Sequence, residues 1–255
     1  RDDVESRGLG DVYKRQGLIW QKPKKLAKLV YIAMAGIMFA TLILTFSRGC
    51  WIGFMITAGL FVTFVCGKIW GLALIALPFL PMVLPESIIN RIASVGDMKD
   101  SSTSYRVYIW YGSLAMVKDF WASGIGPGTQ AFKSVYPFYS YSGIVAPHSH
   151  NMFLQILVES GIVGISVFLT TIVMFFKKLI NGYQSTSGKG SKLGAMIVAI
   201  GAGVAGFCVQ GMFDNCFYNY RVFLIFWIVL ALGIAAVYIA KGEKEESAVK
   251  AVEEE

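Results

Sequence analysis

The feature that most constrains this chain is a series of apolar runs, each close to the length needed to cross a lipid bilayer. A spanning helix needs about 20 mostly apolar residues, and such runs occupy residues 29–46, 51–66, 69–84, 152–176, 193–212 and 223–240. Of the 255 residues, 55% are hydrophobic and only 15% are charged, whereas soluble domains carry about 25% charged residues. We therefore predict an all-α polytopic membrane protein with six transmembrane helices. This excludes a cytosolic enzyme, a nucleic-acid module, a disordered chain and a disulfide scaffold.

The lysines indicate how these helices are oriented. Lysines precede the first run, lie between the second and third and between the fourth and fifth, and follow the last. All these loops share one side if every run crosses, and the positive-inside rule assigns that side to the cytoplasm. The net charge of +7 thus describes membrane orientation and not a nucleic-acid surface. The extracytoplasmic side receives Arg48, the short loop 214–221 and the long connection 85–150.

The long connection is where we expect function to lie, because loops beyond about 15 residues in a compact architecture are usually functional or disordered. Residues 101–104 (SSTS) offer helix N-caps, and apolar residues at 107, 110, 111, 114, 115 and 117 predict an amphipathic helix to about Trp121. Glycines and Pro127 end that helix, and an aromatic cluster follows at 132–141. We expect an ordered extracytoplasmic helical loop that lies on the bilayer surface.

These patterns divide the chain into segments. Residues 6–16 (SRGLGDVYKRQ) resemble the translation of a transposon-based sequencing adapter, so we expect residues 1–16 to be non-native and upstream helices to be missing. Transmembrane helices one to three then occupy 17–84, and the extracytoplasmic loop expected to be catalytic occupies 85–150. Helices four to six occupy 151–240, and a charged cytoplasmic tail follows at 241–255. The four cysteines are expected to be free thiols packed among helices.

Two arginines on the predicted outer side are candidates for binding an anion. Arg48 ends the first run in the motif TFSRG, and Arg106 lies on the predicted loop helix in YRVYIW. Each also has an ordinary explanation. An arginine at a helix end commonly extends to lipid headgroups, and one on a surface helix is commonly just solvated.

The motif HSHN, directly before the fourth run, holds both histidines of the chain, His148 and His150. A His-x-His pair could hold a metal, but no third or fourth ligand is evident nearby, so we expect none. The two histidines could also be simple interface residues. Asn151 is placed to cap the fourth helix. Glu159 lies inside that run, where an acid is a functional candidate, although a hydrogen bond to a neighbouring helix would explain it equally well. Arg221 lies on the same outer side and is a further secondary candidate.

Arg48, Arg106 and His150 all project to one predicted side, and together they suit a phosphate-bearing substrate. Arginine binds phosphate oxygens through paired hydrogen bonds and stays charged. Histidine titrates near neutrality and can accept a proton from a hydroxyl group. The sequence has no Asp-x-Asp pair or carboxylate cluster for Mg²⁺, and no P-loop. We therefore expect a reaction without metal, cofactor or nucleotide.

The order of TFSRG, YRVYIWYGSLAMVKDFWASGIGPGTQAF and HSHNMFLQILVESGIVG resembles the C-terminal half of the O-antigen ligase and O-antigen polymerase family, over about 29–240. The resemblance implies a bacterial membrane glycosyltransferase of the C-type architecture, here truncated. Its donor would be a glycan on undecaprenyl diphosphate, transferred to a sugar hydroxyl outside the cytoplasmic (inner) membrane during assembly of O-antigen, capsule or a similar polysaccharide. Arg48 and Arg106 would hold the donor diphosphate, His150 would be the general base of an inverting transfer, and His148 would rank second.

Several alternatives stay open. A polymerase extends one lipid-linked glycan with another, whereas a ligase moves a finished glycan to a different acceptor, and we lean toward the polymerase because no acceptor-specific feature is present. A transporter or flippase for polyprenyl-linked glycans would need ionisable residues at mid-bilayer and broken helices in paired repeats, but only Glu159 lies well inside a run. An inactive structural membrane protein is the third alternative. The expected partners are the donor, a glycan or lipid-glycan acceptor and the bilayer, with no nucleic acid.

Overall fold

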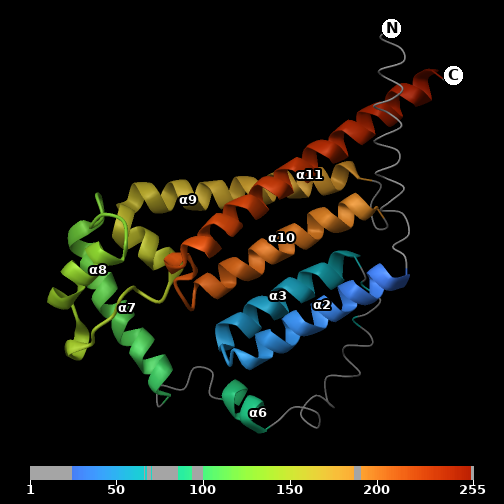
Figure 1. Cartoon of the computed structure of the whole chain (residues 1–255). Helices are drawn as coiled ribbons and strands as arrows, with labels where there is room; N and C mark the ends of the chain where they lie inside the picture. Colours follow the sequence, from blue (N-terminus) through green and yellow to red (C-terminus); the bar gives the residue numbers. More distant parts are fainter. Residues whose placement is uncertain are drawn as a thin grey trace. The chain divides into compact units, whose positions relative to one another are not determined.

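The computed structural model describes residues 25–65, 67, 70, 86–93, 100–186 and 191–253, and every regular element in these ranges is helical (Figure 1). The chain divides into two compact units, Arg1–Ser47 and Arg48–Glu255. The expected non-native segment at 1–16 lies outside the described residues. The third predicted run, 69–84, also lies outside them, apart from Trp70.

The first unit contains the helix α2 (Lys25–Leu44). Its apolar side chains are uncovered, since Leu29, Ile37 and Leu44 are 63%, 66% and 68% exposed. A helix that is apolar on all sides suits a lipid or protein environment and not water. The helix ends two residues before the predicted boundary, and Phe46 has a positive φ of 50°.

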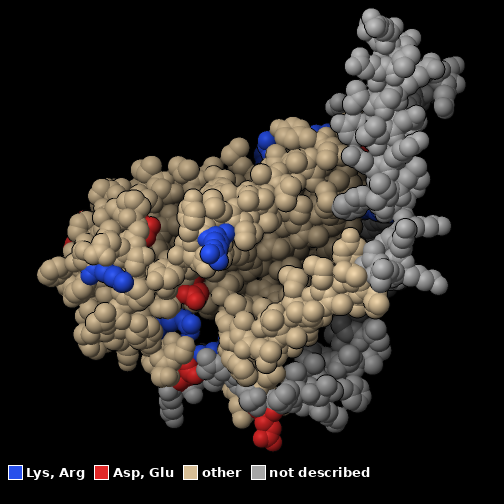
Figure 2. Space-filling model, in the orientation of Figure 1, with Lys and Arg blue, Asp and Glu red and all other residues tan. Residues whose placement is uncertain are grey.

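Four described helices of the second unit are long and apolar enough to cross a membrane. They are α3 (Arg48–Val65), α9 (Met152–Ser185), α10 (Lys192–Gly211) and α11 (Tyr220–Glu253), and they match the second, fourth, fifth and sixth predicted runs. Figure 2 shows a broad uncharged surface over α10 and α11, with charged side chains gathered toward its ends. The chain is therefore an all-α polytopic membrane protein, as predicted. Cys50, Cys208 and Cys216 form no disulfide bond among the described residues, also as predicted, and Cys66 lies outside the described residues.

Small residues bring α3 and α10 together. Gly53 of α3 lies so close to α10 that a Cβ on it would be 2.6 Å from the Gly206 carbonyl oxygen. Thr57 Oγ1 donates to the Ala202 carbonyl at 3.2 Å across the same interface. Helices in lipid associate through such close backbone approach and interhelical hydrogen bonds, because lipid supplies no hydrophobic driving force. This contact fixes Arg48, the first residue of α3, relative to α10.

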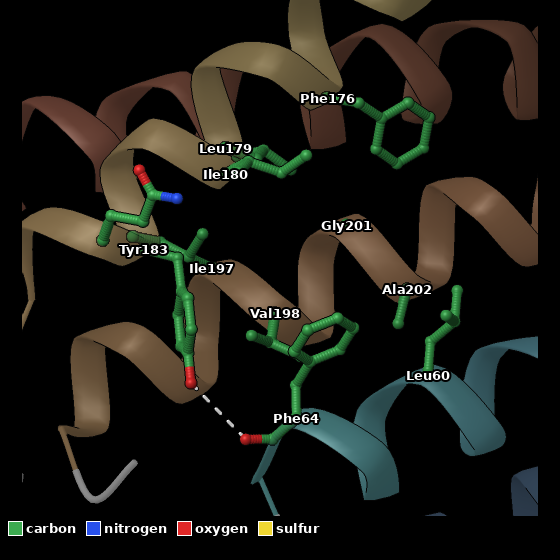
Figure 3. Close-up of a pocket in the computed structure, with 11 residues that line it drawn as sticks. Leu60, Phe64, Phe176, Leu179, Ile180, Tyr183, Ile197, Val198, Gly201 and Ala202 are labelled. Atoms are coloured by element: carbon green, nitrogen blue, oxygen red, sulfur yellow. Dashed lines mark hydrogen bonds between the residues drawn. The ribbon is translucent and has the colours of Figure 1, made fainter. Parts of the chain in front are cut away.

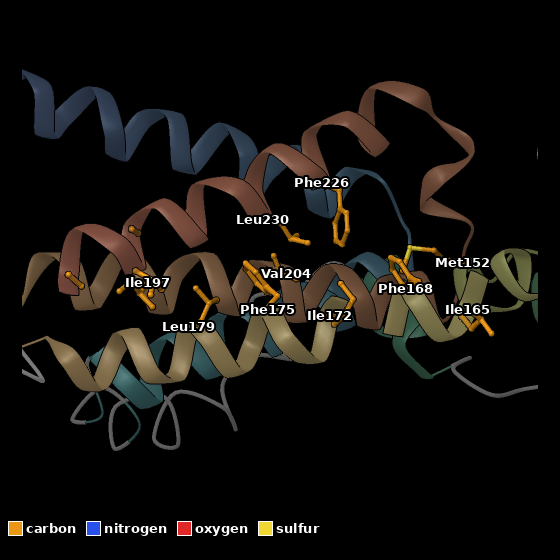
Figure 4. Close-up of a cluster of buried hydrophobic side chains, with 13 residues drawn as sticks. Met152, Ile165, Phe168, Ile172, Phe175, Leu179, Ile197, Val204, Phe226 and Leu230 are labelled. Atoms are coloured by element: carbon orange, nitrogen blue, oxygen red, sulfur yellow. The ribbon is translucent and has the colours of Figure 1, made fainter. Parts of the chain in front are cut away.

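The larger hydrophobic core lies between α9, α10 and α11 (Figure 4). Its buried members come from all three helices and include Phe168, Phe175, Val204, Phe226 and Leu230. The 3-10 helix η4 (Cys216–Tyr218), in the turn between α10 and α11, is anchored to this core because the Phe217 and Phe226 rings lie 5.1 Å apart. The core thereby positions the turn on which Asp214 lies.

The described part of the connection before α9, residues 86–93 and 100–151, folds into helices and turns, which confirms the expected ordered helical loop. It comprises α6 (Glu86–Ala93), α7 (Ser101–Phe120), α8 (Thr129–Val135) and the 3-10 helices η2 (Tyr136–Phe138) and η3 (Tyr141–Gly143). A second buried cluster joins α7, α8 and η2 to the start of α9, and it includes Ile109, Met116, Phe132, Tyr136 and Val158. This cluster holds α7 beside the segment that follows the histidine motif.

The helix α7 confirms the predicted helix, but its cap and its buried face differ from the prediction. Asp100 is the N-cap, since its carboxylate accepts the Thr103 N–H at 3.0 Å, and the residues at 101–104 lie inside the helix. Tyr111 and Leu114, expected on the apolar stripe, are 57% and 50% exposed. The buried face instead contains Gly112, where a Cβ would lie 2.8 Å from the Tyr136 ring. Close packing at this glycine rotates the buried face away from the predicted stripe.

The helix α9 is broken at Gly161, whereas the sequence predicted one continuous span over 152–176. Gly161 has φ +63°, a conformation that favours glycine. The Val158 and Glu159 carbonyls accept hydrogen bonds from the N–H groups of Ile125 and Gly126 at 2.9 and 3.0 Å. The loop after α7 therefore supplies partners for carbonyls that lose their helical hydrogen bonds at the break. Broken helices are tolerated at membrane depth where other protein groups complete their hydrogen bonds. Glu159 therefore lies in a short segment, 152–160, that is bound to the loop, and not within one uninterrupted span.

Candidate active site

Arg48 reaches the first turn of α7. Its Nη2 lies 2.8 Å from Asp100 Oδ1 and 3.2 Å from Thr103 Oγ1, and the Arg48 and Asp100 side chains are only 11% and 15% exposed. A mostly buried ion pair is favourable only when further hydrogen bonds satisfy its partners, and the Thr103 N–H supplies one to Asp100. The guanidinium group of Arg48 is thereby fixed at the N-terminus of α7.

Arg106 lies one turn further along the same face of α7. Its Nη1 donates to Ser102 Oγ at 2.8 Å. Its Nε is buried and has no hydrogen-bond partner among the described residues. Thr103, which contacts Arg48, precedes Arg106 by three residues, and residues three apart are neighbours on a helix surface. The two guanidinium groups therefore share the first turns of α7, and one buried N–H of Arg106 is left for an acceptor.

His150 lies against the same part of α7. Its ring meets the Tyr105 ring edge-on at a centroid distance of 5.8 Å, and its carbonyl accepts from Trp110 Nε1 at 3.4 Å. His150 has φ +49°, which is uncommon for a residue other than glycine, and strained backbone of this kind concentrates at functional sites. The structure thus brings His150 and Arg106 to one stretch of α7, with Arg48 at its start.

An acid in the turn before α11 orients the His150 ring. Asp214 Oδ1 lies 3.0 Å from His150 Nδ1, and the Asp214 side chain is 41% exposed. Burial raises the pKa of Asp214, but the hydrogen bond and charge of His150 and the Asn215 N–H outweigh burial and leave this pKa below its ordinary value. A carboxylate that stays ionised beside Nδ1 keeps the proton on that nitrogen, so Nε2 is the basic nitrogen.

His148 packs against His150, with ring centroids 4.2 Å apart. Its Nδ1 accepts the His150 backbone N–H at 3.2 Å. Burial, followed by the charge of His150, lowers the pKa of His148 to about 4. His148 is therefore uncharged at neutral pH, and its contact supports the strained backbone of His150.

Among the described residues, one group has metal-ligating atoms close enough to share an ion. The ligand atoms of His148, His150 and Asp214 all lie within 4.8 Å of one another, so Asp214 is a third potential ligand that the sequence did not reveal. However, His148 Nδ1 accepts the His150 N–H, and His150 Nδ1 is paired with Asp214. As arranged, the group is a hydrogen-bonded network, and a cation bound through these Nδ1 atoms would have to replace those bonds.

Asn151 caps α9, as the sequence predicted. Its Oδ1 accepts the Leu154 N–H at 3.0 Å, and its Nδ2 donates to the Met212 carbonyl at 3.0 Å. Asn151 thereby ties the histidine motif to the turn that carries Asp214. Arg221 is exposed on the first turn of α11, with its backbone N–H bonded to Asn219 Oδ1 at 3.0 Å. No described hydrogen bond or ion pair links its side chain to the other candidates.

Gln155, which the sequence analysis did not single out, connects Glu159 to the histidine motif. It is 4% exposed. Its Oε1 accepts the Ser149 N–H at 2.7 Å, and its Nε2 donates to Glu159 Oε1 at 2.8 Å. Glu159 is therefore linked through one buried amide to the residue that precedes His150.

A separate apolar cavity of about 390 Å³ lies between α3, α9 and α10 (Figure 3). No charged side chain lines it, and the Tyr183 hydroxyl donates to the Phe64 carbonyl at 3.5 Å at its edge. Phe64 and Tyr183 lie near the ends of α3 and α9 that are opposite to Arg48 and His150. The lining suits a hydrocarbon chain and lacks groups for acid–base chemistry.

Comparison with known proteins identifies one family. A family model described as O-antigen ligase matches residues 33–169, which is more than half of the chain. The matched segment includes Arg48, Arg106 and His150 and ends before Asp214 and Arg221, whereas the resemblance noted in the sequence extends to about residue 240. No curated protein matches the chain.

Proposed function

Because this chain belongs to the O-antigen ligase family, we propose that it transfers a glycan from undecaprenyl diphosphate to a sugar hydroxyl. Membership implies activity of the ligase or polymerase type in surface polysaccharide assembly. The finer proposal is that transfer occurs on the outer side of the bacterial cytoplasmic membrane, with the C-terminus in the cytoplasm. The distribution of lysines supports this orientation.

The observation that carries the proposal is the meeting of two arginines and one histidine along the first turns of α7. An arginine has five N–H donors, so Arg48 can keep its bond to Asp100 and still bind a phosphate oxygen. Arg106 has no acidic partner among the described residues, and its Nε has no acceptor. These groups can hold a diphosphate, and the His150 ring contacts Tyr105, the residue next to Arg106 on the same helix.

In the proposed step, His150 Nε2 takes the proton of the acceptor hydroxyl while that oxygen forms a bond to the anomeric carbon of the donor. The bond between this carbon and the diphosphate oxygen breaks, and its electron pair leaves with undecaprenyl diphosphate, so the configuration inverts. Asp214 stabilises the imidazolium that forms, and solvent then removes its proton. No metal or cofactor takes part in this step.

The arginines act on the charge that develops on the leaving diphosphate. Groups fixed in advance at such a charge are commonly the largest contribution to catalysis, and removing one costs about 10²–10³ in rate, or about 3–4 kcal/mol. Arg48 is fixed by Asp100 and Thr103, and Arg106 is held by Ser102. Both side chains are therefore partly oriented before a donor binds.

One observation bears on the alternative of a polyprenyl-glycan transporter. The break in α9 is a feature that transporters share, because they bind substrates at interrupted helices. Here, however, the Val158 and Glu159 carbonyls at the break bond to the loop after α7. These two acceptors are therefore already occupied, which favours a structural role for the break.

The test uses the full-length protein in proteoliposomes, with undecaprenyl-diphosphate-linked glycan and the host's lipid and polymer acceptors. Products are separated on a gel beside those of His150→Gln, whose amide can still bond to Asp214 but cannot act as a base. A His150-dependent ladder of lipid-linked chains would identify a polymerase, and one discrete product on another acceptor would identify a ligase. Wild-type turnover by His150→Gln would contradict the proposed base. If labelled glycan-lipid crosses the bilayer and no transfer product forms, the protein is a transporter and not a glycosyltransferase.

A further inference from the structure

A second cavity, of about 450 Å³, lies beside the histidine motif. It is bordered by the start of α8, the 152–160 segment of α9, η4 and the start of α11. Its polar and aromatic lining includes Gln155, Glu159, Asn215, Phe217, Tyr218 and Tyr220. Unlike the apolar cavity between α3, α9 and α10, it combines polar groups with aromatic rings.

The cavity adjoins the candidate base through one aromatic ring. The Tyr218 ring lies 4.7 Å from the His148 ring, which is itself 4.2 Å from the His150 ring. Asn215, which also lines the cavity, donates its N–H to Asp214 Oδ1 at 2.9 Å. A molecule in the cavity would therefore lie next to the group formed by His148, His150 and Asp214.

The polar lining is fixed before any ligand binds. Gln155 holds Glu159 Oε1 at 2.8 Å and is itself held by the Ser149 N–H. A carboxylate can accept several hydrogen bonds through its two oxygens. Glu159 is thus an oriented acceptor for hydroxyl hydrogens at the wall of the cavity, and it is coupled to the backbone of the histidine motif.

The chemistry of the lining fits a sugar ring. A pyranose presents hydroxyl groups around its edge and C–H groups on its faces, so it is bound by polar side chains at the edge and an aromatic ring against a face. The volume lies within the usual range of small-molecule sites, about 300–1,000 Å³. Glu159 is the one charged residue in the lining, and no lysine or arginine lines the cavity. A carboxylate without a cation would repel an acidic sugar and accept a neutral one.

We propose that this cavity binds a neutral sugar ring of the acceptor, with Glu159 as hydrogen-bond acceptor and Tyr218 as the aromatic surface against which the ring stacks. The assignment to the acceptor rests on the proposed function, because the acceptor hydroxyl must reach His150. The cavity thereby selects neutral acceptor sugars against uronic acids. Glu159 and Tyr218 are specificity-determining residues in this arrangement.

The test is direct binding, measured by saturation-transfer NMR on the full-length protein in lipid nanodiscs. The probes are the methyl glycosides of glucose, galactose, mannose, N-acetylglucosamine and N-acetylgalactosamine, together with methyl glucuronide and methyl galacturonide. We expect at least one neutral glycoside to bind and the uronides not to bind. Glu159→Gln and Tyr218→Ala should each weaken that binding about tenfold, because the first replaces a charged hydrogen-bond acceptor by a neutral amide and the second removes the stacking ring. Tyr218→Phe should retain most of the binding.

Tyr111→Ala is the matched control, because Tyr111 lies on α7 outside the cavity and is 57% exposed, close to the 55% of Tyr218. This variant should bind as the wild type does. The proposal is overturned if no neutral glycoside binds, if the uronides bind as tightly, or if Glu159→Gln and Tyr218→Ala leave binding unchanged. If glycosides bind but the protein transfers no glycan, the proposed function is refuted and the sugar site is retained. If the protein transfers glycan but binds no glycoside, the sugar site is refuted and the proposed function is retained.

Discussion

The replacement Asp214→Asn tests how His150 is made basic. The amide keeps the size of the carboxylate but removes its charge. His150 Nδ1, now 3.0 Å from Asp214 Oδ1, would face either an amide oxygen or an amide N–H. In the second case the proton moves to Nε2, and the ring can no longer accept a proton from the acceptor hydroxyl. The charge that stabilises the imidazolium is lost in both cases.

The exposure of Asp214 sets the size of the expected effect. In serine proteases, where the corresponding acid is buried, the same replacement lowers kcat about 10⁴-fold. Asp214 is 41% exposed, and water screens the interactions of an exposed charge. We therefore expect a loss of about 10²-fold in kcat, which corresponds to about 2.7 kcal/mol of transition-state stabilisation.

The assay is steady-state transfer by the full-length protein in proteoliposomes, with kcat and the donor KM measured separately. The kcat should fall while the donor KM stays close to that of the wild type, because the proposal gives Asp214 no contact with the donor. Asp119→Asn is the matched control, since Asp119 is an exposed acid of α7 that accepts from the Tyr139 hydroxyl at 2.6 Å. A kcat close to the wild-type value for Asp214→Asn, in protein that inserts normally, would refute the role given to this acid.

Three further predictions concern pH, helix packing and metal. Folded His148 binds a proton only near pH 4, whereas an unfolded histidine does so near 6.5. The unfolded chain thus binds more protons between these values, so the free energy of unfolding falls by about 3 kcal/mol as the pH drops through that window. Thermal unfolding at a series of pH values should show this loss of stability. The variant His148→Gln should show a smaller loss. Gly206→Leu should force α10 away from α3 and lower the free energy of unfolding by about 1–3 kcal/mol. Glycan transfer should also be lost, because α3 carries Arg48. The control Gly203→Leu, at a position where a Cβ meets nothing within 4 Å, should unfold at the wild-type temperature in the same thermal scan. Transfer should be unchanged after treatment with EDTA, and a loss that Zn²⁺ or Mn²⁺ restores would show instead that the two histidines and the aspartate bind a metal.

The membrane helices were predictable because lipid demands long apolar segments, and α3, α9, α10 and α11 lie where the runs indicated. The break in α9 was not predictable. Its glycine occurs in an ordinary apolar sequence, and the break depends on the positive φ of Gly161 and on N–H groups from residues 125 and 126. The buried face of α7 was misplaced for a similar reason, since close packing at Gly112 against Tyr136 decides which side is covered.

The site was partly predictable, because a predicted topology can place residues on one side of a membrane. Arg48, Arg106 and His150 were singled out as candidates in this way, and the structure brings them to the first part of α7. Their acidic partners were missed, because Asp100 is 52 residues from Arg48 and Asp214 is 64 residues from His150. A usable signal for Asp214 was present, since it is the one acid in the loop 212–219 on the predicted outer side.

Arg106 allows the cleanest test of the arginines. Removing Arg48 would leave Asp100 mostly buried without its partner, and breaking a buried pair costs about 3–5 kcal/mol. A loss of activity in Arg48→Ala would therefore combine folding with chemistry. Arg106 donates to Ser102 and has no ion pair with a described acid. Replacing Arg106 therefore leaves no described carboxylate without its partner.

The most direct measurement is the single-turnover rate of glycan transfer from undecaprenyl diphosphate by Arg106→Ala, with the full-length protein in proteoliposomes. Lys118→Ala, which removes an exposed cation from the last turn of the same helix, is the control and should transfer at the wild-type rate. A loss of about 10²–10³ in the Arg106 variant, with normal insertion, is the result expected for a group that holds the leaving diphosphate. Equal rates for both variants and the wild type would contradict the assignment of this site to glycosyl transfer.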